Sequence, residues 1–243
     1  AVLLAVDLVE KAIQENPSLN LGAATGGTME PIYGELARRV KKGSISLRNI
    51  KTFQLDEYFP IAPTHPQSYR SFLMKHLVET TDASPENLYV PDGAASDPAA
   101  ACEEWERIMC ENPIALQLHG IGVNGHIAFI EPRKNPTREI FSMRTSLEEL
   151  TFSTLQSNSR FFKPGEVQPT RAITVGMGTL LESVAHFVLV AFGKEKSAAV
   201  ARVAASRLGL VFAGPKRGAT RPVRGDGGSG HLELSASFKF VDV

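Results

Sequence analysis

A histidine that can move protons lies close to two polar partners in one stretch of the sequence, His119–Pro132. Asn124, His126 and Glu131 place an amide, an imidazole and a carboxylate within eight residues. A histidine exchanges protons near neutral pH, and neighbouring polar groups set its tautomer and its basicity. Glycines between them let the backbone turn sharply and let a ligand approach closely. The stretch predicts an acid–base site; the alternative is a glycine-rich loop with a surface histidine.

A second candidate for proton transfer is the acidic pair Asp56 and Glu57, which follows the apolar run Ile50–Leu55. Adjacent side chains at the end of a strand point to opposite sides. One carboxylate can therefore enter a site while the other faces away and pairs elsewhere. A base that moves a proton between two carbon atoms belongs at such a position; the alternative is a solvated acidic turn.

Three separate features predict a site for an anion such as phosphate. The turn Thr25–Thr28, which contains Gly26 and Gly27, precedes a helical segment whose first amides can hold phosphate. Arg160 lies on an apolar segment. Lys196 lies near a helix start, where a cation opposes the helix dipole unless an anion is bound. The structural alternatives are a threonine-capped turn, an arginine that extends to solvent and a solvated lysine.

The elements that would position these side chains alternate between strand and helix. Apolar runs predict strands, and apolar residues at helical spacing predict helices. The predicted strands are 19–24, 50–55, 114–118, 171–175 and 187–192, and the predicted helices are 2–13, 32–40, 69–78, 98–110, 150–158, 179–183 and 197–205. This alternation predicts a Rossmann-like, three-layer α/β fold with a mostly parallel central sheet and helices on both faces.

A conspicuous loop follows each of these five predicted strands. The loops are Thr25–Thr28, Asp56–Pro60, Gly120–Glu131, Gly176–Thr179 and Gly193–Lys196. Parallel strands would bring all five loops to one edge of the sheet, which is where open α/β sheets bind their ligands. We therefore expect a single site at that edge.

The composition limits the classes of partner. The chain has 243 residues, and we expect 1–243 to form a single domain. Its 26 basic and 26 acidic side chains balance, so we expect no nucleic-acid partner, and no apolar run is long enough to cross a membrane. No signal peptide is indicated, and the two cysteines suit reduced thiols, so we expect a cytoplasmic protein. The spacing of histidines and cysteines indicates no zinc site.

Seven segments occur together in a specific order. They are Leu21–Thr28, Phe53–Tyr58, His65–Tyr69, Gly120–Pro132, Asn158–Phe162, Ala172–Thr179 and Gly193–Lys196. Through them the chain resembles the glucosamine-6-phosphate deaminase (isomerase) family over roughly residues 1 to 205.

The resemblance implies conversion of glucosamine 6-phosphate to fructose 6-phosphate and ammonia. It implies that Asp56 is the base that moves a proton between C2 and C1 of the sugar. It also implies that His126 helps to open the sugar ring, and that Glu131 and Asn124 orient His126. No metal or organic cofactor is implied, and the implied partner is a small-molecule sugar phosphate. A homo-oligomer is compatible with the resemblance.

The resemblance also assigns the phosphate site and a lid. It implies that Thr25, Gly26, Gly27, Thr28, Arg160 and Lys196 hold the phosphate. A mobile lid is implied within 150–171, where it would shield the intermediate from water.

The chain departs from the family pattern at three places. Many members have aspartate where this chain has Asn124, which can orient a ring but carries no charge. Ile130 stands where the family usually has asparagine. The segment 208–230, rich in glycine and arginine, is atypical for the family and would make a poor buried strand.

Two other functions fit the same pattern. A 6-phosphogluconolactonase would share the fold and the phosphate site, but such enzymes typically have arginine after the Asp-Glu pair and lack the equivalent of Glu131. A non-catalytic sugar-phosphate sensor would keep the same pocket. Release of ammonia from glucosamine 6-phosphate distinguishes the three functions.

Overall fold

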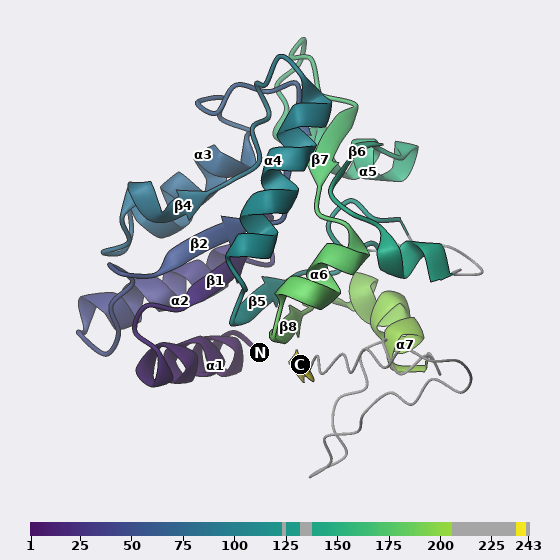
Figure 1. The fold of residues 1–243 in the computed structure, drawn as a ribbon. Helices are drawn as coiled ribbons and strands as arrows, with labels where there is room; N and C mark the ends of the chain where they lie inside the picture. Colours follow the sequence, from purple (N-terminus) through teal and green to yellow (C-terminus); the bar gives the residue numbers. More distant parts are fainter. Residues whose placement is uncertain (123–124, 132–137, 206–236, 242–243) are drawn as a thin grey trace, which may run out of the picture.

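The computed structural model of the chain describes residues 1–122, 125–131, 138–205 and 237–241 (Figure 1). Asn124 and the atypical segment 208–230 lie outside the described residues. The described residues contain no helix that is long and apolar enough to cross a membrane.

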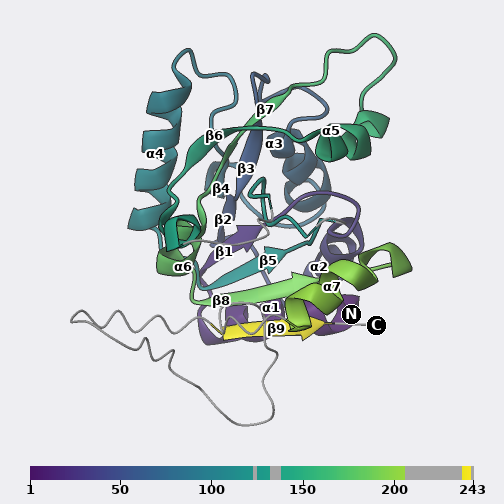
Figure 2. The ribbon, with the colours of Figure 1, turned by 90° about the vertical axis from the view of Figure 1, so that its right-hand side faces the viewer.

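The centre of the molecule is a six-stranded sheet in the order β4-β2-β1-β5-β8-β9. Every neighbouring pair in it is parallel, so the predicted parallel sheet is confirmed. Figure 2 shows the arrows of β5, β8 and β9 pointing the same way. The strands are β1 (Asn20–Ala23), β2 (Lys51–Gln54), β4 (Leu88–Tyr89), β5 (Leu116–His119), β8 (His186–Val190) and β9 (Ser237–Val241).

Helices cover both faces of this sheet, as expected for three layers. Successive side chains of β8 point to opposite faces of the sheet. Val188 and Val190 belong to a core cluster with α1 and α2, whereas Phe187 and Leu189 pack with α4, α6 and α7. In Figure 1, α1 lies below the strands β1 and β2, and α6 and α7 lie toward the right. The helices are α1 (Val2–Glu15), α2 (Glu30–Lys41), α3 (Tyr69–Leu73) with its π-helical continuation η1 (Met74–Val78), α4 (Pro98–Glu111), α6 (Met177–Ser183) and α7 (Ser197–Ala205).

A second, antiparallel sheet of three strands was not expected from the sequence. Its order is β3-β7-β6, formed by β3 (Asp56–Phe59), β7 (Arg171–Thr174) and β6 (Ser146–Glu149). The expected loop 56–60 is thus largely a strand. The expected strand 171–175 belongs to this sheet, so the Gly176–Thr179 loop does not follow a strand of the parallel sheet.

One residue separates the two sheets at the end of β2. The carbonyl of Leu55 accepts a hydrogen bond from the Val175 amide at 3.0 Å, just beyond the end of β7. The chain therefore passes directly from the parallel sheet into the antiparallel one, with Asp56 as the first residue of β3. This junction brings a strand of the smaller sheet to the edge where β1, β2, β5 and β8 end.

Candidate active site

Loops from three strands of the parallel sheet meet at its carboxyl edge. A side chain at Gly120 would lie 3.8 Å from the Cε atom of Met29, which follows the Thr25–Thr28 turn. Lys196 donates a hydrogen bond from Nζ to the carbonyl of Ile121 at 2.8 Å. The loops after β1, β5 and β8 are therefore neighbours, as the parallel order predicts.

Asp56 is an aspartate held almost completely out of water, with 7% of its surface exposed. Its Oδ1 accepts a hydrogen bond from Nε2 of Gln54 at 2.8 Å, two residues earlier on the same side of the chain. Burial raises the pKa of Asp56 to about 7, the Gln54 hydrogen bond opposes this rise, and the charge of Glu57 adds to it. A carboxylate with such a pKa can both accept and return a proton near neutrality.

Glu57 is buried as well, but it serves the start of helix α3. Its carboxylate accepts hydrogen bonds from the backbone amides of Tyr69 at 2.9 Å and Arg70 at 3.0 Å. A further bond comes from the Tyr58 amide at 3.0 Å. Both carboxylate oxygens thus satisfy helix N-terminal donors that have no partner within the helix. Of the acidic pair, Glu57 is therefore the residue that faces away from the site and caps α3.

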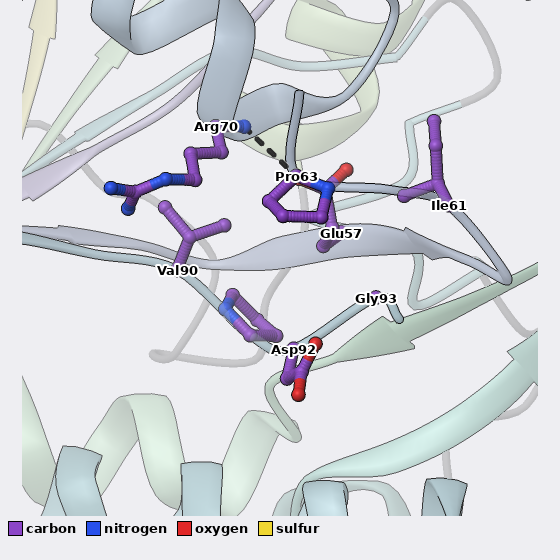
Figure 3. Close-up of a pocket in the computed structure, with 8 residues that line it drawn as sticks. Glu57, Ile61, Pro63, Arg70, Val90, Asp92 and Gly93 are labelled. Carbon is purple, nitrogen blue, oxygen red and sulfur yellow. Dashed lines mark hydrogen bonds between the residues drawn. The ribbon is translucent and has the colours of Figure 1, made fainter. Parts of the chain in front are cut away.

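A cavity of about 210 Å³ lies beside Glu57 (Figure 3). Its lining residues are Glu57, Ile61, Pro63, Arg70, Val90, Pro91, Asp92 and Gly93. Of the candidate residues named from the sequence, Glu57 lines it, and Asp56, His126 and Glu131 do not. We therefore separate this cavity from the candidate active site.

His126 is held on the glycine-rich loop by close packing. A Cβ atom added at Gly122 would overlap the His126 imidazole ring, so only glycine fits there without a shift. Burial lowers the pKa of His126, the charge of Glu131 opposes this, and the charge of Lys196 adds to it. The imidazole is therefore favoured in its neutral form, which can take up or donate a proton.

Glu131 lies at the other end of the same loop and contacts helix α5 (Phe152–Asn158). Its Oε1 accepts hydrogen bonds from the hydroxyls of Thr151 at 2.9 Å and Thr154 at 3.1 Å. Between His126 and Glu131 the chain forms a tight turn, with Ala128 at a φ of 51°. A positive φ is unfavourable for alanine, which is a mark of a constrained functional loop.

The same loop is bonded to the strand that pairs with Asp56. The Phe129 amide donates to the Thr174 hydroxyl at 3.2 Å, and Thr174 is the register partner of Asp56 in the antiparallel pair β3–β7. Asp56 and the loop that carries His126 and Glu131 are therefore fixed against one strand, β7. The described part of the loop is thus bonded to the residue that pairs with Asp56 across the sheet.

The residues expected to bind phosphate are only partly brought together. Gly26 has a φ of 93°, which favours glycine, and it shapes the turn before α2, where no side chain caps the helix N-terminus. Lys196 and this turn lie at the same edge. Arg160 is exposed instead, with its guanidinium 4.8 Å from the centroid of the Phe161 ring. In the part of the chain that the structure describes, no hydrogen bond or ion pair joins Arg160 to the other phosphate candidates.

Some residues of the site were not expected from the sequence. Gln54 could have been found, because it lies two residues before Asp56 and so shares its side of the strand. Thr151 and Thr154 lie about twenty residues from Glu131, and no local pattern signals their contact. His119, at the end of β5, is buried, and this burial lowers its pKa to about 4, so it adds no positive charge beside His126.

Sequence comparisons match the chain to known proteins over most of its length. A sequence model of the family of glucosamine-6-phosphate isomerases and 6-phosphogluconolactonases matches residues 1–221. The glucosamine-6-phosphate deaminase of Hahella chejuensis is 43% identical over 191 residues, which cover 78% of this chain and 70% of that protein. The same enzyme of Thermoanaerobacter sp. is 39% identical over 197 residues, or 81% and 76% of the two chains.

Solved structures with the same fold include enzymes of two kinds. A monomeric glucosamine-6-phosphate deaminase superposes with a TM-score of 0.79 at 29% identity, covering 98% of this chain and 92% of that one. The 6-phosphogluconolactonase of Thermotoga maritima superposes with a TM-score of 0.65 at 18% identity, covering 98% and 94%. The second similarity concerns the fold alone.

Proposed function

Because the chain belongs to the family of glucosamine-6-phosphate isomerases and 6-phosphogluconolactonases, we propose that it deaminates an amino-sugar phosphate. The proposed substrate is glucosamine 6-phosphate, and the products are fructose 6-phosphate and ammonia. Relatives named as glucosamine-6-phosphate deaminases at 39–43% identity support this substrate.

His126 and Glu131 carry out the first step, the opening of the sugar ring. Breaking the bond between C1 and the ring oxygen requires a proton on that oxygen, while the C1 hydroxyl gives one up. A neutral imidazole can move such a proton, and the charge of Glu131 stabilises the imidazolium that forms in passing. Asn124, which belongs to the same loop in the sequence, is assigned a share in orienting the His126 imidazole.

Asp56 carries out the second step, the transfer of a proton from C2 to C1. Removal of the C2 proton, with addition of a proton to the C1 oxygen, gives an enolamine, and return of the proton to C1 leaves a protonated imine at C2. Water adds to this imine and ammonia leaves. One buried carboxylate suffices for both transfers, because its pKa of about 7 makes it a competent base and a competent acid near neutral pH.

The phosphate is assigned to the Thr25–Thr28 turn, including Gly26 and Gly27, together with Lys196 and Arg160. The uncapped N-terminus of α2 and the Lys196 ammonium supply donors and positive charge at the sheet edge. Arg160 would complete this set when the segment 150–171 folds over bound substrate. We assign that segment the role of a lid.

The observation that supports the proposal most directly is the environment of Asp56. Asp56 is buried and accepts one hydrogen bond, from the side-chain amide of Gln54. It pairs across the sheet with Thr174, whose hydroxyl is bonded to the loop that carries His126. This environment suits proton transfer between carbons. The test is to supply glucosamine 6-phosphate and follow ammonia and fructose 6-phosphate. A protein that instead hydrolyses 6-phosphogluconolactone, or that binds the sugar phosphate without turnover, would refute the proposal.

A further inference from the structure

Helix α5 is bonded to the candidate active site at both of its ends. At its start, the hydroxyls of Thr151 and Thr154 both donate to Oε1 of Glu131. At its end, the Asn158 side-chain amide donates to the Tyr58 hydroxyl at 2.8 Å. Tyr58 lies two residues after Asp56 and so shares its side of β3. The helix therefore connects Glu131 to the strand that carries Asp56.

Polar contacts hold this helix in place together with the packing of Leu155 against a core cluster that contains Tyr58 and Phe129. It has only seven residues, too few for an isolated helix to be stable in water. Its first residue, Phe152, is 79% exposed. Thr154, by contrast, is 3% exposed and directs its hydroxyl at Glu131. A buried hydroxyl aimed at a carboxylate fixes both groups, since either would lose a partner if the helix moved.

We propose that Thr151 and Thr154 are positioning residues, which hold the Glu131 carboxylate in the orientation that supports His126 during ring opening. This inference rests on the proposed deaminase function. The two hydroxyls bind the same oxygen and so fix the rotation of the carboxylate about its own axis. Glu131 then presents its charge to His126 from a defined place.

The test is Thr154→Val, which keeps the shape of the side chain and removes the hydroxyl. A hydrogen bond to a charged group is worth roughly ten- to a hundredfold in rate, so with Thr151 still in place kcat should fall about tenfold. KM should change less than about twofold, because the Thr154 hydroxyl is directed at Glu131 and the proposal gives it no contact with substrate. Thr154→Ser should restore kcat. Ser157→Ala is the matched control, since that exposed hydroxyl bonds only within its own helix.

Repeating the substitution in a Glu131→Gln variant separates a positioning role of Thr154 from a general loss of structure. In Glu131→Gln, which is itself slow, adding Thr154→Val should lower kcat by less than about twofold, because the charge to be oriented is gone. Equal losses in both backgrounds, or a kcat within twofold of the unaltered protein for Thr154→Val, would overturn the inference. If Thr154→Val folds poorly, Thr154→Ala replaces it, since alanine favours the helix.

The inference can fail separately from the proposed function. An unaltered protein that releases no ammonia refutes the function alone. In that case a crystal structure of Thr154→Val decides the positioning role. The Glu131 carboxylate should turn away from its original direction, and an unmoved carboxylate would overturn the inference.

Discussion

Replacement of Asp56 by asparagine should remove activity and at the same time stabilise the protein. The asparagine keeps the shape of the side chain, and its carbonyl oxygen can still accept the hydrogen bond from Gln54. It cannot accept a proton from carbon. A positioned base is worth about 10²–10⁴-fold, so we expect kcat to fall at least about 100-fold while substrate binding is largely kept.

The stability gain follows from the pKa of Asp56. This pKa is about 7 in the folded protein and about 3.9 in an unfolded chain. The folded state therefore binds the proton more tightly, so its stability is greatest below about pH 4 and is lost as the pH rises through about 7. At about 1.4 kcal/mol per pH unit, the full cost near pH 8 approaches about 4 kcal/mol, and we expect about 2–4 kcal/mol to be recovered.

Thermal melts and turnover measured at several pH values test both parts of this prediction. Near pH 8 the variant should melt about 5–12 °C higher than the unaltered protein, and near pH 4 the two should agree. In the unaltered protein, kcat/KM should rise with pH through about 7. Glu57→Gln is the matched control, because Glu57 caps α3 and should leave turnover per folded molecule within about fivefold. Near-normal turnover in Asp56→Asn, or no gain in melting temperature, would refute the reasoning.

Three other predictions concern the phosphate site, the loop and metal ions. Arg160→Ala should raise KM about ten- to a hundredfold, and unphosphorylated glucosamine should be a very poor substrate; an unchanged KM would contradict the assignment. Gly122→Ala should lower kcat at least about tenfold, because its methyl group displaces the His126 ring, whereas Gly34→Ala, which meets no atom within 4 Å, should leave activity unchanged. Prolonged chelation should leave activity intact, since the described residues contain no group of three or more potential metal ligands; loss of activity that added metal restores would disprove this.

Several strands of the parallel sheet could be predicted because they lie in short, mainly apolar runs, whereas β4 and β9 were not predicted. The segments 19–24, 114–118 and 187–192 are short runs of this kind, and they became β1, β5 and β8. The second sheet escaped prediction for a physical reason. Asp56 and Glu57 make β3 resemble an acidic turn, and β6 has the polar sequence Ser146–Glu149. Their pairing with β7 is a long-range contact that no local pattern contains.

The candidate site was predictable to the extent that it follows from strand alternation. The division of Asp56 and Glu57 between two tasks followed from their adjacency on a strand. The contacts of Glu131 with Thr151 and Thr154 did not, because hydroxyls that cap a helix usually bond to their own backbone. The exposed position of Arg160 also could not be read from its apolar neighbours.

The position of Asp56 relative to His126 depends on strand β7. Asp56 belongs to the antiparallel sheet, whereas the loop of His126 begins at the end of β5 in the parallel sheet. Two bonds near the end of β7 join them: Val175 donates to Leu55 beside Asp56, and Thr174 accepts from Phe129 in the loop. Both bonds involve backbone atoms, which move less than side chains. The groups that we propose for ring opening and for proton transfer are therefore both tied to β7, and in our proposal α5 orients the Glu131 carboxylate.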